Sequence, residues 1–239
     1  MELQDHALKL IQMLKVQEKW AKNAAFALSG GVDSSLLFQL LGVEKRPYIV
    51  GIENSQDLEF AMKYCNFIHV SPERLVVTES EIHEFSGIVK KIDPKISFLD
   101  LGFETVLAIL LARIREERLV TGQGADEIFY GYSKFRDGRE MDNRSSLEKL
   151  FRVTLPREEK IASYFGKMLI TPYLDASLVS YFSNLSMAEN IKRNENKIIL
   201  REAGKVCGLP EFIYNRSKKA AQYGSGVKKV QEKLFIKKW

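Results

Sequence analysis

Ser29-Gly30-Gly31-Val32-Asp33-Ser34 directly follows the apolar run Asn23-Ala24-Ala25-Phe26-Ala27-Leu28. The apolar run predicts a buried strand, and residues 35–41 predict a helix. The two glycines allow a tight turn with positive φ angles, so successive backbone N–H groups can point at one anion. The helix that follows directs the positive end of its dipole to the same place. Together these features predict a phosphate-binding turn between a strand and a helix.

The side chains of this turn also suit a nucleotide. Two hydroxyl donors and a carboxylate that can hold a metal ion accompany the glycines. The stretch lacks the Gly-x-x-x-x-Gly-Lys-Ser/Thr pattern of a Walker-type loop. It resembles instead the PP-loop of ATP pyrophosphatases, which cleave ATP between the α- and β-phosphates, transfer AMP to a substrate and release pyrophosphate. The resemblance implies ATP as cofactor, bound by Ser29, Gly30, Gly31, Asp33 and Ser34. The alternative is an ordinary glycine turn between a strand and a helix.

A second glycine-rich turn lies in Leu119-Val120-Thr121-Gly122-Gln123-Gly124-Ala125-Asp126-Glu127-Ile128-Phe129-Tyr130-Gly131-Tyr132. It resembles the Ser-Gly-Glu-Gly-Ser-Asp-Glu-x-Phe-x-Gly-Tyr string of the asparagine synthetase family. In that family the Asp of this string and the PP-loop Asp hold Mg²⁺ on the pyrophosphate, which implies Asp126 and Asp33 here. Two carboxylates at neighbouring strand ends suit an octahedral Mg²⁺ that also takes phosphate oxygens. We expect Gly122 and Gly124 to line the nucleotide site. The alternative is that the acidic residues only complement a helix dipole.

The C-terminal third resembles the same family. The family order there is Lys-x-x-Leu-Arg, Leu-Pro-x-x-Ile and Arg-x-Lys, followed by a loop that contains glycine. The matching segments are Lys197-Ile198-Ile199-Leu200-Arg201, Leu209-Pro210-Glu211-Phe212-Ile213, Asn215-Arg216-Ser217-Lys218-Lys219 and Gly224-Ser225-Gly226. The lysine of Arg-x-Lys lies on the reacting phosphates in the family, which implies Lys218 as the catalytic lysine. Lys219 competes with it because the glycine loop does not fix the register, and a solvated basic stretch is the alternative for both.

Two departures from the family concern the acceptor and the nitrogen. The family string Gly-x-Glu-x-Arg-x-Pro-Phe-Leu-Asp matches residues 166–175, but Met168 and Ile170 replace its Glu and Arg. Neither side chain can take a proton or bind a carboxylate. We therefore expect a small-molecule carboxylate or amide acceptor other than aspartate. Glutamine-dependent relatives also begin with a glutaminase, whereas this chain reaches its PP-loop at residue 29. We expect nitrogen from free ammonia, from an amine substrate, or from a glutaminase or other ammonia-supplying partner.

Length and composition favour one globular domain. The chain has 239 residues, of which 45% are hydrophobic, so it can bury a sizeable core. We expect a helix over residues 1–22, a nucleotide-binding α/β core over 23–135 and a helical part with a basic tail over 136–239. Cys65 and Cys207 are too few for a disulfide framework. No stretch is apolar enough to span a membrane, so we expect a cytoplasmic protein without membrane contact.

The order of elements predicts the α/β fold class. Expected strands are residues 24–28, 48–52, 67–70 and 119–121, and expected helices are 35–41, 57–64, 79–92 and 101–117. This alternation predicts a parallel sheet with helices on both faces and a ligand at the carboxyl ends of its strands. In the family the adenine lies at the end of the second strand, which implies Gly51. Asp57 matches an acidic position of the family, and a helix start explains it equally well. No strand is expected after about Arg136.

The charge leaves a second class of partner open. The net charge is +5, and residues 205–239 carry nine Lys or Arg against two Glu. A basic tail can attract ATP or contact nucleic acid. The favoured function is an AMP-forming synthetase that adenylates a carboxylate or amide oxygen for capture by ammonia or an amine. The alternatives are a PP-loop enzyme that modifies tRNA, although the usual Cys-x-x-Cys pairs are missing, and a nucleotide-binding protein without synthetase activity.

Overall fold

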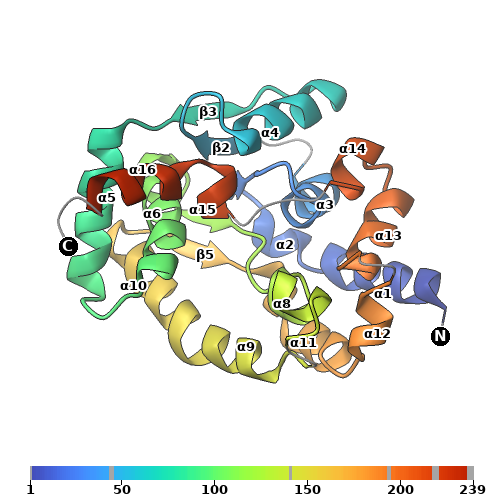
Figure 1. Cartoon of the computed structure of the whole chain (residues 1–239). Coiled ribbons are helices and arrows are strands. Elements are labelled where there is room, and N and C mark those ends of the chain that lie inside the picture. Colours follow the sequence, from blue (N-terminus) through green and yellow to red (C-terminus); the bar gives the residue numbers. More distant parts are fainter. Residues whose placement is uncertain (1, 43–45, 140–141, 193–194, 217–220, 236–239) are drawn as a thin grey trace.

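A five-stranded parallel sheet forms the centre of the computed structural model, which describes residues 2–42, 46–139, 142–192, 195–216 and 221–235 (Figure 1). The strand order is β3-β2-β1-β4-β5, and every neighbouring pair is parallel. The strands are β1 (Ala25–Ala27), β2 (Pro47–Gly51), β3 (Glu73–Val76), β4 (Arg118–Val120) and β5 (Met168–Ile170). The predicted α/β class with a parallel sheet is confirmed.

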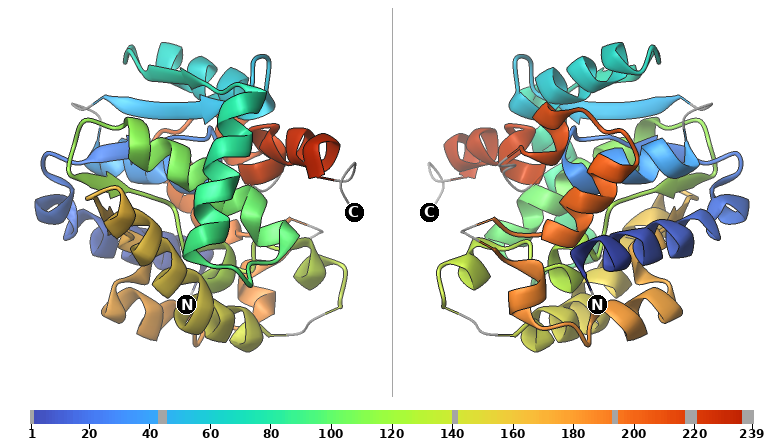
Figure 2. Two further views of the ribbon diagram at one scale, coloured as in Figure 1. Left: turned by 90° about the vertical axis from the view of Figure 1, so that its left-hand side faces the viewer. Right: turned by 90° about the vertical axis from the view of Figure 1, so that its right-hand side faces the viewer.

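Helices cover both faces of the sheet (Figure 2). Alternate strand residues face opposite sides. Phe26 and Ile49 join one apolar cluster, whereas Ala25 and Tyr48 join the other. The first cluster takes residues from α1 (Leu3–Lys15), α3 (Val32–Leu41), α4 (Gln56–Phe67), α11 (Ala176–Phe182) and α13 (Ile198–Val206). The second takes residues from α5 (Glu79–Ile92), α6 (Phe98–Arg113), α10 (Leu155–Tyr164) and α16 (Val227–Phe235).

Short helices and turns complete the chain. They are α2 (Glu18–Ala21), α7 (Ala125–Ile128), α8 (Ser133–Arg136), α9 (Arg144–Lys149), a π-helical turn (Leu150–Thr154), a 3₁₀ turn (Pro172–Leu174), α12 (Met187–Asn190), α14 (Glu211–Tyr214) and α15 (Ala221–Gly224). None of the described helices is both long and apolar enough to cross a lipid bilayer.

The strand order places the two glycine-rich turns side by side. From β1 the chain moves outward through β2 to β3, and it then returns to the other side of β1 for β4 and β5. The direction in which successive strands are added to the sheet therefore reverses between β1 and β4. The PP-loop follows β1, and the turn at residues 121–124 follows β4. Both turns leave the carboxyl ends of adjacent strands, which is where open α/β sheets bind ligands.

Three expectations about individual elements were wrong. The expected helix over residues 1–22 is broken, because α1 ends at Lys15 and a separate turn of helix forms α2. Residues 67–70 are not a strand, because α4 continues to Phe67 and His69 has a φ of 56°. The third strand begins later, at Glu73. Finally, a strand does follow Arg136, because β5 pairs with β4 and forms the edge of the sheet.

Candidate functional site

The PP-loop is a tight turn that only glycine fits at its second position. Gly30 has a φ of +66°, and a Cβ there would lie 2.6 Å from the backbone nitrogen of Ala61. Gly31 is the N-cap residue of α3, with Ser35 N–H donating to its carbonyl. Helix α3 therefore starts directly at the turn and directs its N-terminus to it, as the sequence predicts.

The two serines of the loop bond to each other. The backbone N–H of Ser29 donates to Ser34 Oγ at 3.1 Å, and the two hydroxyl oxygens are 2.9 Å apart. Ser34 Oγ also lies 3.3 Å from the carbonyl oxygen of Gly31. These bonds close the loop on itself. Both serines thus have a structural role in the loop, in addition to the phosphate contacts expected of them.

Asp33 and Asp126 lie on either side of one lysine. Lys197 Nζ is 2.7 Å from Asp33 Oδ2 and 2.6 Å from Asp126 Oδ1. The side chain of Lys197 is 8% exposed. Burial alone would lower the pKa of its ammonium, but Asp126 and Asp33 outweigh burial and raise it above the ordinary value. Lys197 therefore stays charged and holds together the two carboxylates that the sequence assigned to a metal.

Gly131 has no side chain, which leaves room for Lys197 to approach Asp126. A Cβ at Gly131 would clash with both Asp126 Oδ1 and Lys197 Cε. Lys197 itself has a φ of 56° at the N-cap of α13, and Asn196 Nδ2 beside it donates to the Gly131 carbonyl. The Gly131 and Lys197 of the quoted motifs thus meet, although they lie far apart in the sequence.

The carboxylate pair fits Mg²⁺. Asp33 Oδ1 is buried and accepts no hydrogen bond from any described residue, so a hard oxygen donor is left without a partner. The described residues form no cluster of three or more His, Cys, Asp or Glu side chains suited to a metal. Mg²⁺ commonly takes only one or two carboxylates and completes its shell with water and substrate phosphates. Asp33 and Asp126 therefore suit a metal that arrives with a nucleotide.

The turn after β4 is packed against the PP-loop. Gly122 is so close that a Cβ there would lie 3.4 Å from Asp33 Cβ. Gly124 has a φ of +90°, and a Cβ there would overlap the side chain of Leu174. The hydroxyl of Tyr173 donates to the carbonyl oxygen of Asp33 at 2.9 Å. The 3₁₀ turn at Pro172–Leu174 therefore contacts both glycine-rich turns.

Buried carboxyl groups lie behind the turn after β4. Burial, and then the Asp126 charge, raise the pKa of Glu127 from 4.5 to about 7. Tyr132 Oη donates to Glu127 Oε1 at 2.5 Å. Burial likewise raises the pKa of Glu158, whose Oε1 accepts a hydrogen bond from Gln123 Nε2 at 2.5 Å. Both carboxyl groups therefore tend toward the protonated form near neutral pH.

Gly51 lies where the end of β2 meets the C-terminal part of the chain. The N–H of Ile52 donates to the carbonyl of Ser225 at 2.9 Å. A Cβ at Gly51 would overlap Ser55 Oγ and would lie 3.2 Å from the Ser225 carbonyl oxygen. The adenine position expected at Gly51 is thus flanked by the Gly224-Ser225-Gly226 segment, which the sequence analysis quoted only as a match to the family.

Four further residues named from the sequence are Lys218, Lys219, Met168 and Ile170. Lys218 and Lys219 lie outside the described residues. Met168 pairs with Arg118 at the amino end of β5 and is 56% exposed. Ile170 pairs with Val120 at the carboxyl end, next to the turn after β4. Of these two departures from the family, only Ile170 therefore lies at the edge of the sheet from which the PP-loop leaves.

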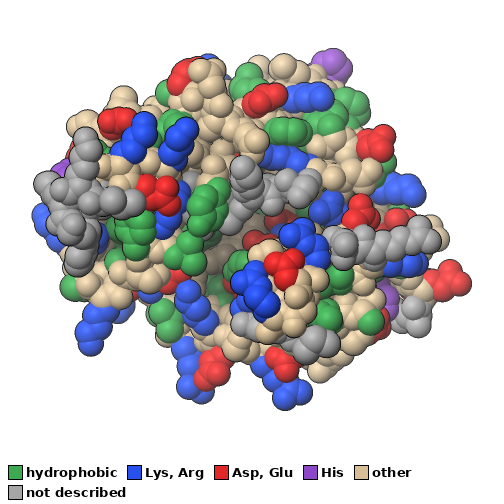
Figure 3. Space-filling model, viewed as in Figure 1, with side chains coloured by type: hydrophobic (Ala, Val, Ile, Leu, Met, Phe, Trp, Pro, Cys, Tyr) green, Lys and Arg blue, Asp and Glu red, His purple; other side chains and the backbone are tan. Residues whose placement is uncertain are grey.

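The face of the molecule seen in Figure 3 is hollowed near its middle, between α15 and α8, with acidic and basic side chains at the rim.

Two of the described basic side chains of residues 205–239 are buried, whereas Lys205, Lys229 and Lys233 are exposed. Lys228 is 5% exposed, and its Nζ donates to the carbonyl of Phe98 at 2.9 Å. Arg216 is buried as well, with a 5% exposed side chain. These two cations are therefore not part of a solvated surface for nucleic acid.

Lys197 is one of two residues whose role could not be assigned from the sequence. Its motif was quoted, but no partner was assigned to it. The available signal was a lysine at the start of a segment resembling the family, in a chain with two carboxylates that needed a counter-charge. Arg216 was also quoted without a role.

Comparison with known proteins places the chain in one family. The family model described as asparagine synthase matches residues 21–151 and 140–237. A protein of Methanocaldococcus jannaschii, named as an asparagine synthetase of the glutamine-hydrolysing type, is 30% identical over 281 residues, covering 99% of this chain and 51% of that protein. The asparagine synthetase of Sandersonia aurantiaca, also named glutamine-hydrolysing, is 25% identical over 84% of this chain and 43% of its own length.

A shorter match is to a protein named for an asparagine synthetase domain. Mouse (Mus musculus) asparagine synthetase domain-containing protein 1 is 32% identical over 127 residues, covering 48% of this chain and 20% of that protein. The chain thus spans about half the length of the Methanocaldococcus jannaschii and Sandersonia aurantiaca proteins, 51% and 43%.

Proposed function

The chain belongs to the asparagine synthase family, and from that premise we propose that it is an ATP-dependent, AMP-forming amide ligase. In the proposed reaction, a carboxylate or amide oxygen of the acceptor attacks the α-phosphorus of ATP. Pyrophosphate leaves, and ammonia or an amine then captures the adenylate. The PP-loop residues Ser29–Ser34 would bind the phosphates.

One observation carries the proposal. Asp33 and Asp126 come from turns after different strands, and Lys197 Nζ lies within 2.7 Å of both carboxylates. Opposed carboxylates beside a glycine turn and a helix N-terminus form an environment for phosphates with a divalent cation. A glycine turn with only a structural role would not need such a constellation.

The residues would act mainly by positioning and by charge. Asp33 and Asp126 would hold Mg²⁺, which when bound neutralises phosphate charge. The N–H groups at the start of α3 would hold the phosphate oxygens in line for the attack. A further cation would favour the departure of pyrophosphate, and we assign this role to Lys218, with Lys219 as the competing candidate.

The acceptor and the nitrogen source belong to this proposal. Ile170 stands at the carboxyl end of β5, where the family string has an arginine. An acceptor with less charge than aspartate, or a larger one, suits an aliphatic side chain there. Nitrogen would come from ammonia, from an amine or from a glutaminase partner. Relatives named glutamine-hydrolysing are about twice as long as this chain.

Nucleotide binding and products test the proposal. Calorimetry should show ATP·Mg²⁺ binding to the unaltered protein and at least about tenfold weaker binding to Asp33→Ala, because losing even a hydrogen-bond partner of a metal ligand commonly costs that much affinity. Turnover should give AMP and pyrophosphate, measured by chromatography together with ATP–pyrophosphate exchange across small carboxylates, with and without tRNA. ADP as the main product would overturn the mechanism.

The two lysines can be separated by kinetics. Lys218→Ala should lower kcat far more than it weakens ATP binding, because its charge matters most as pyrophosphate leaves. If Lys219→Ala has that effect instead, Lys219 takes the role. If exchange is absent while ATP binds normally, the protein is a nucleotide-binding protein without synthetase activity.

A further inference from the structure

Arg216 donates hydrogen bonds to backbone carbonyls of the PP-loop. Its Nη1 donates to the carbonyl oxygen of Ser29 at 3.1 Å and to that of Gly30 at 3.0 Å. These are the two peptide groups at the start of the phosphate-binding turn. Arg216 therefore contacts the loop through its backbone, and it does so from the segment that precedes the Lys218–Lys219 pair.

Because the peptide group is planar, these hydrogen bonds also fix the direction of the N–H groups of Gly30 and Gly31. In a planar trans peptide the C=O and the N–H of the next residue point in opposite directions. When the carbonyls of Ser29 and Gly30 point at Arg216, the N–H groups of Gly30 and Gly31 must point away from it. No described residue accepts a hydrogen bond from those two N–H groups. Successive N–H groups directed to one side form an anion-binding nest.

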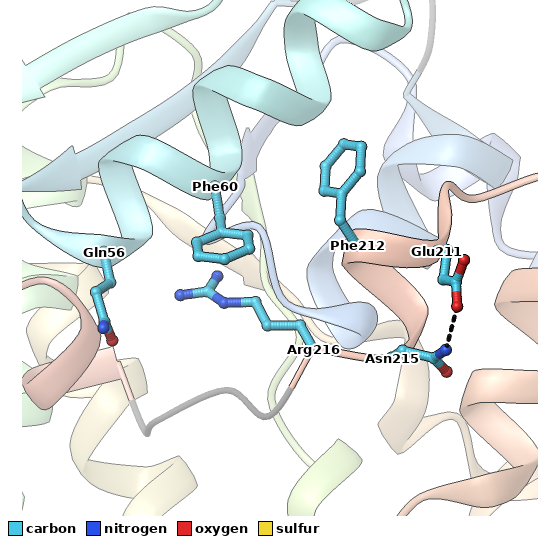
Figure 4. A pocket seen from close by; sticks show the side chains of 6 residues that line it. All are labelled: Gln56, Phe60, Glu211, Phe212, Asn215 and Arg216. Carbon is cyan, nitrogen blue, oxygen red and sulfur yellow. Dashed lines mark hydrogen bonds between the residues drawn. The ribbon is translucent and has the colours of Figure 1, made fainter.

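Arg216 is itself held on three sides. Its Nη2 lies 3.1 Å from Asp57 Oδ1, and the two side chains are 5% and 4% exposed. Its guanidinium stacks on the Phe60 ring, 4.0 Å from the centroid (Figure 4). Asp57 is backed by Gly224, where a Cβ would clash with its carboxylate. A planar fork with five donors suits this arrangement of two carbonyls, one carboxylate and a ring, and a lysine cannot reproduce it.

The ion pair with Asp57 limits what Arg216 can bind. A buried guanidinium next to a phosphate site would ordinarily be a candidate phosphate ligand. Here its charge is paired with a buried carboxylate, and its donors are directed to backbone carbonyls. Arg216 therefore acts on the phosphates through the loop and not by direct contact.

We propose that Arg216, oriented by Asp57 and Phe60, is a positioning residue that fixes the two PP-loop peptides so that the N–H groups of Gly30 and Gly31 face the ATP phosphates. This inference rests on the proposed ATP binding. It assigns a role to residues that contact the PP-loop and not the phosphates, and neither the motif nor the family match assigns that role. The pair Asp57–Arg216 also explains the acidic residue at the start of α4, for which a helix-start role was the alternative.

The test compares ATP with AMP on the full chain. A positioning role affects the nest for the terminal phosphates, so Arg216→Ala should reduce the ratio of ATP to AMP affinity about 10- to 100-fold, measured by calorimetry with Mg²⁺. Arg216→Lys should reduce it almost as much. Free guanidinium, added below the concentration that lowers Tm, should partly restore the ratio in Arg216→Ala. A merely structural arginine would not give this phosphate-selective loss and rescue.

Asp57→Asn tests the chain of contacts and serves where Arg216→Ala folds poorly. It should reduce the ratio in the same direction by a smaller factor. The double variant should match Arg216→Ala, because Asp57 acts through Arg216. Arg113→Ala is the control, since Arg113 also bonds a backbone carbonyl (Val76) and a carboxylate (Glu81) but no PP-loop group. Its ratio should equal that of the unaltered protein.

The outcomes separate the inference from the function. An unchanged ATP to AMP ratio in Arg216→Ala or in Asp57→Asn, with the unaltered protein binding ATP, would overturn the positioning role and leave the proposed function standing. Equal loss of ATP and AMP affinity without guanidinium rescue would also overturn it. Absence of ATP binding in the unaltered protein would overturn the proposed function itself.

Discussion

Lys197 Nζ lies 2.6 Å from Asp126 Oδ1, and the same ammonium contacts Asp33 at 2.7 Å. The cation therefore occupies the space between the two carboxylates assigned to the metal. Without it, two like charges would face each other, on Asp33 with a 16% exposed side chain and on Asp126 with a 40% exposed side chain. Lys197 thus compensates the charge of the two carboxylates when no divalent cation neutralises them.

Removing this lysine should make the protein depend on Mg²⁺. Lys197→Met leaves the two carboxylates facing each other without the ammonium between them. Breaking a fully buried pair costs about 3–5 kcal/mol, and we expect a smaller loss here because the Asp126 side chain is 40% exposed. We expect a lower Tm than in the unaltered protein without Mg²⁺, and a larger rise in Tm when Mg²⁺ replaces Na⁺ at equal ionic strength. The measurement is thermal unfolding in both salts.

A matched control is available for Lys197. Lys149 pairs with Asp100 at 2.9 Å but is 54% exposed, and exposed pairs contribute about 0–1 kcal/mol. Lys149→Met should therefore leave Tm and its response to Mg²⁺ nearly unchanged. Equal responses of the two variants would refute the role given to Lys197.

Gly30→Ala should abolish ATP binding and destabilise the fold. The positive φ of +66° and the 2.6 Å approach to Ala61 leave no room for a Cβ. Gly87→Ala is the control, because nothing lies within 4 Å of a Cβ there and Gly87 is inside α5. Alanine in a helix interior is favoured over glycine by about 1 kcal/mol, so Gly87→Ala should be slightly stabilising. Urea unfolding and calorimetry measure both, and wild-type ATP affinity in Gly30→Ala would contradict the loop geometry.

The raised pKa of Glu127 predicts a pH dependence of stability. Its folded-state pKa is about 7 against an ordinary 4.5, so the folded state retains a proton that the unfolded chain loses. The stabilisation from this group is complete below pH 4.5, falls as the pH rises to about 7 and stays constant above that. Glu127→Gln mimics the protonated group. It should be more stable than the unaltered protein at pH 8, by up to about 3 kcal/mol, and no more stable at pH 4.5. Urea unfolding across this range measures it, and a pH-independent difference would argue against a titrating Glu127.

Aspartate should be a poor acceptor. Its ammonium and two carboxylates need partners, and an unpaired buried charge costs several kcal/mol, roughly. Ile170 offers none at the carboxyl end of β5. With aspartate, ATP, Mg²⁺ and ammonium supplied together, we expect no robust asparagine by mass spectrometry. Formation at an ordinary enzyme rate of ~1–10 s⁻¹ would establish an ammonia-dependent asparagine synthetase instead.

The sequence predicts those parts of the site that are encoded locally. Glycine turns between apolar strands and helices identified the PP-loop and the turn after β4, because their conformation depends on a few adjacent residues. Lys197 could not be placed from sequence, since its contacts with Asp33 and Asp126 depend on how α13 packs against the sheet. The role of Arg216 was hidden for the same reason, because its partners are backbone carbonyls.

The errors in the fold have a similar origin. The three residues of β5 become a strand only through pairing with β4, so a short apolar stretch after helical sequence gave no sign of it. The break between α1 and α2 falls in a stretch where a single helix was expected, and the large apolar side chain of Trp20 in this stretch is 55% exposed. Strand pairing and helix ends set by packing lie beyond local patterns.

The 3₁₀ turn at Pro172–Leu174 touches both glycine-rich turns, through the Tyr173 hydroxyl on Asp33 and the Leu174 side chain on Gly124. The spacing between the two carboxylate-bearing turns is therefore set by residues from the second half of the chain. A fragment that ended after α8 would keep both glycine motifs but would lose this brace, the fifth strand and the lysine between the carboxylates. The candidate site thus depends on both halves of the described chain, and we expect the two glycine motifs not to work as a unit without the sequence that follows them.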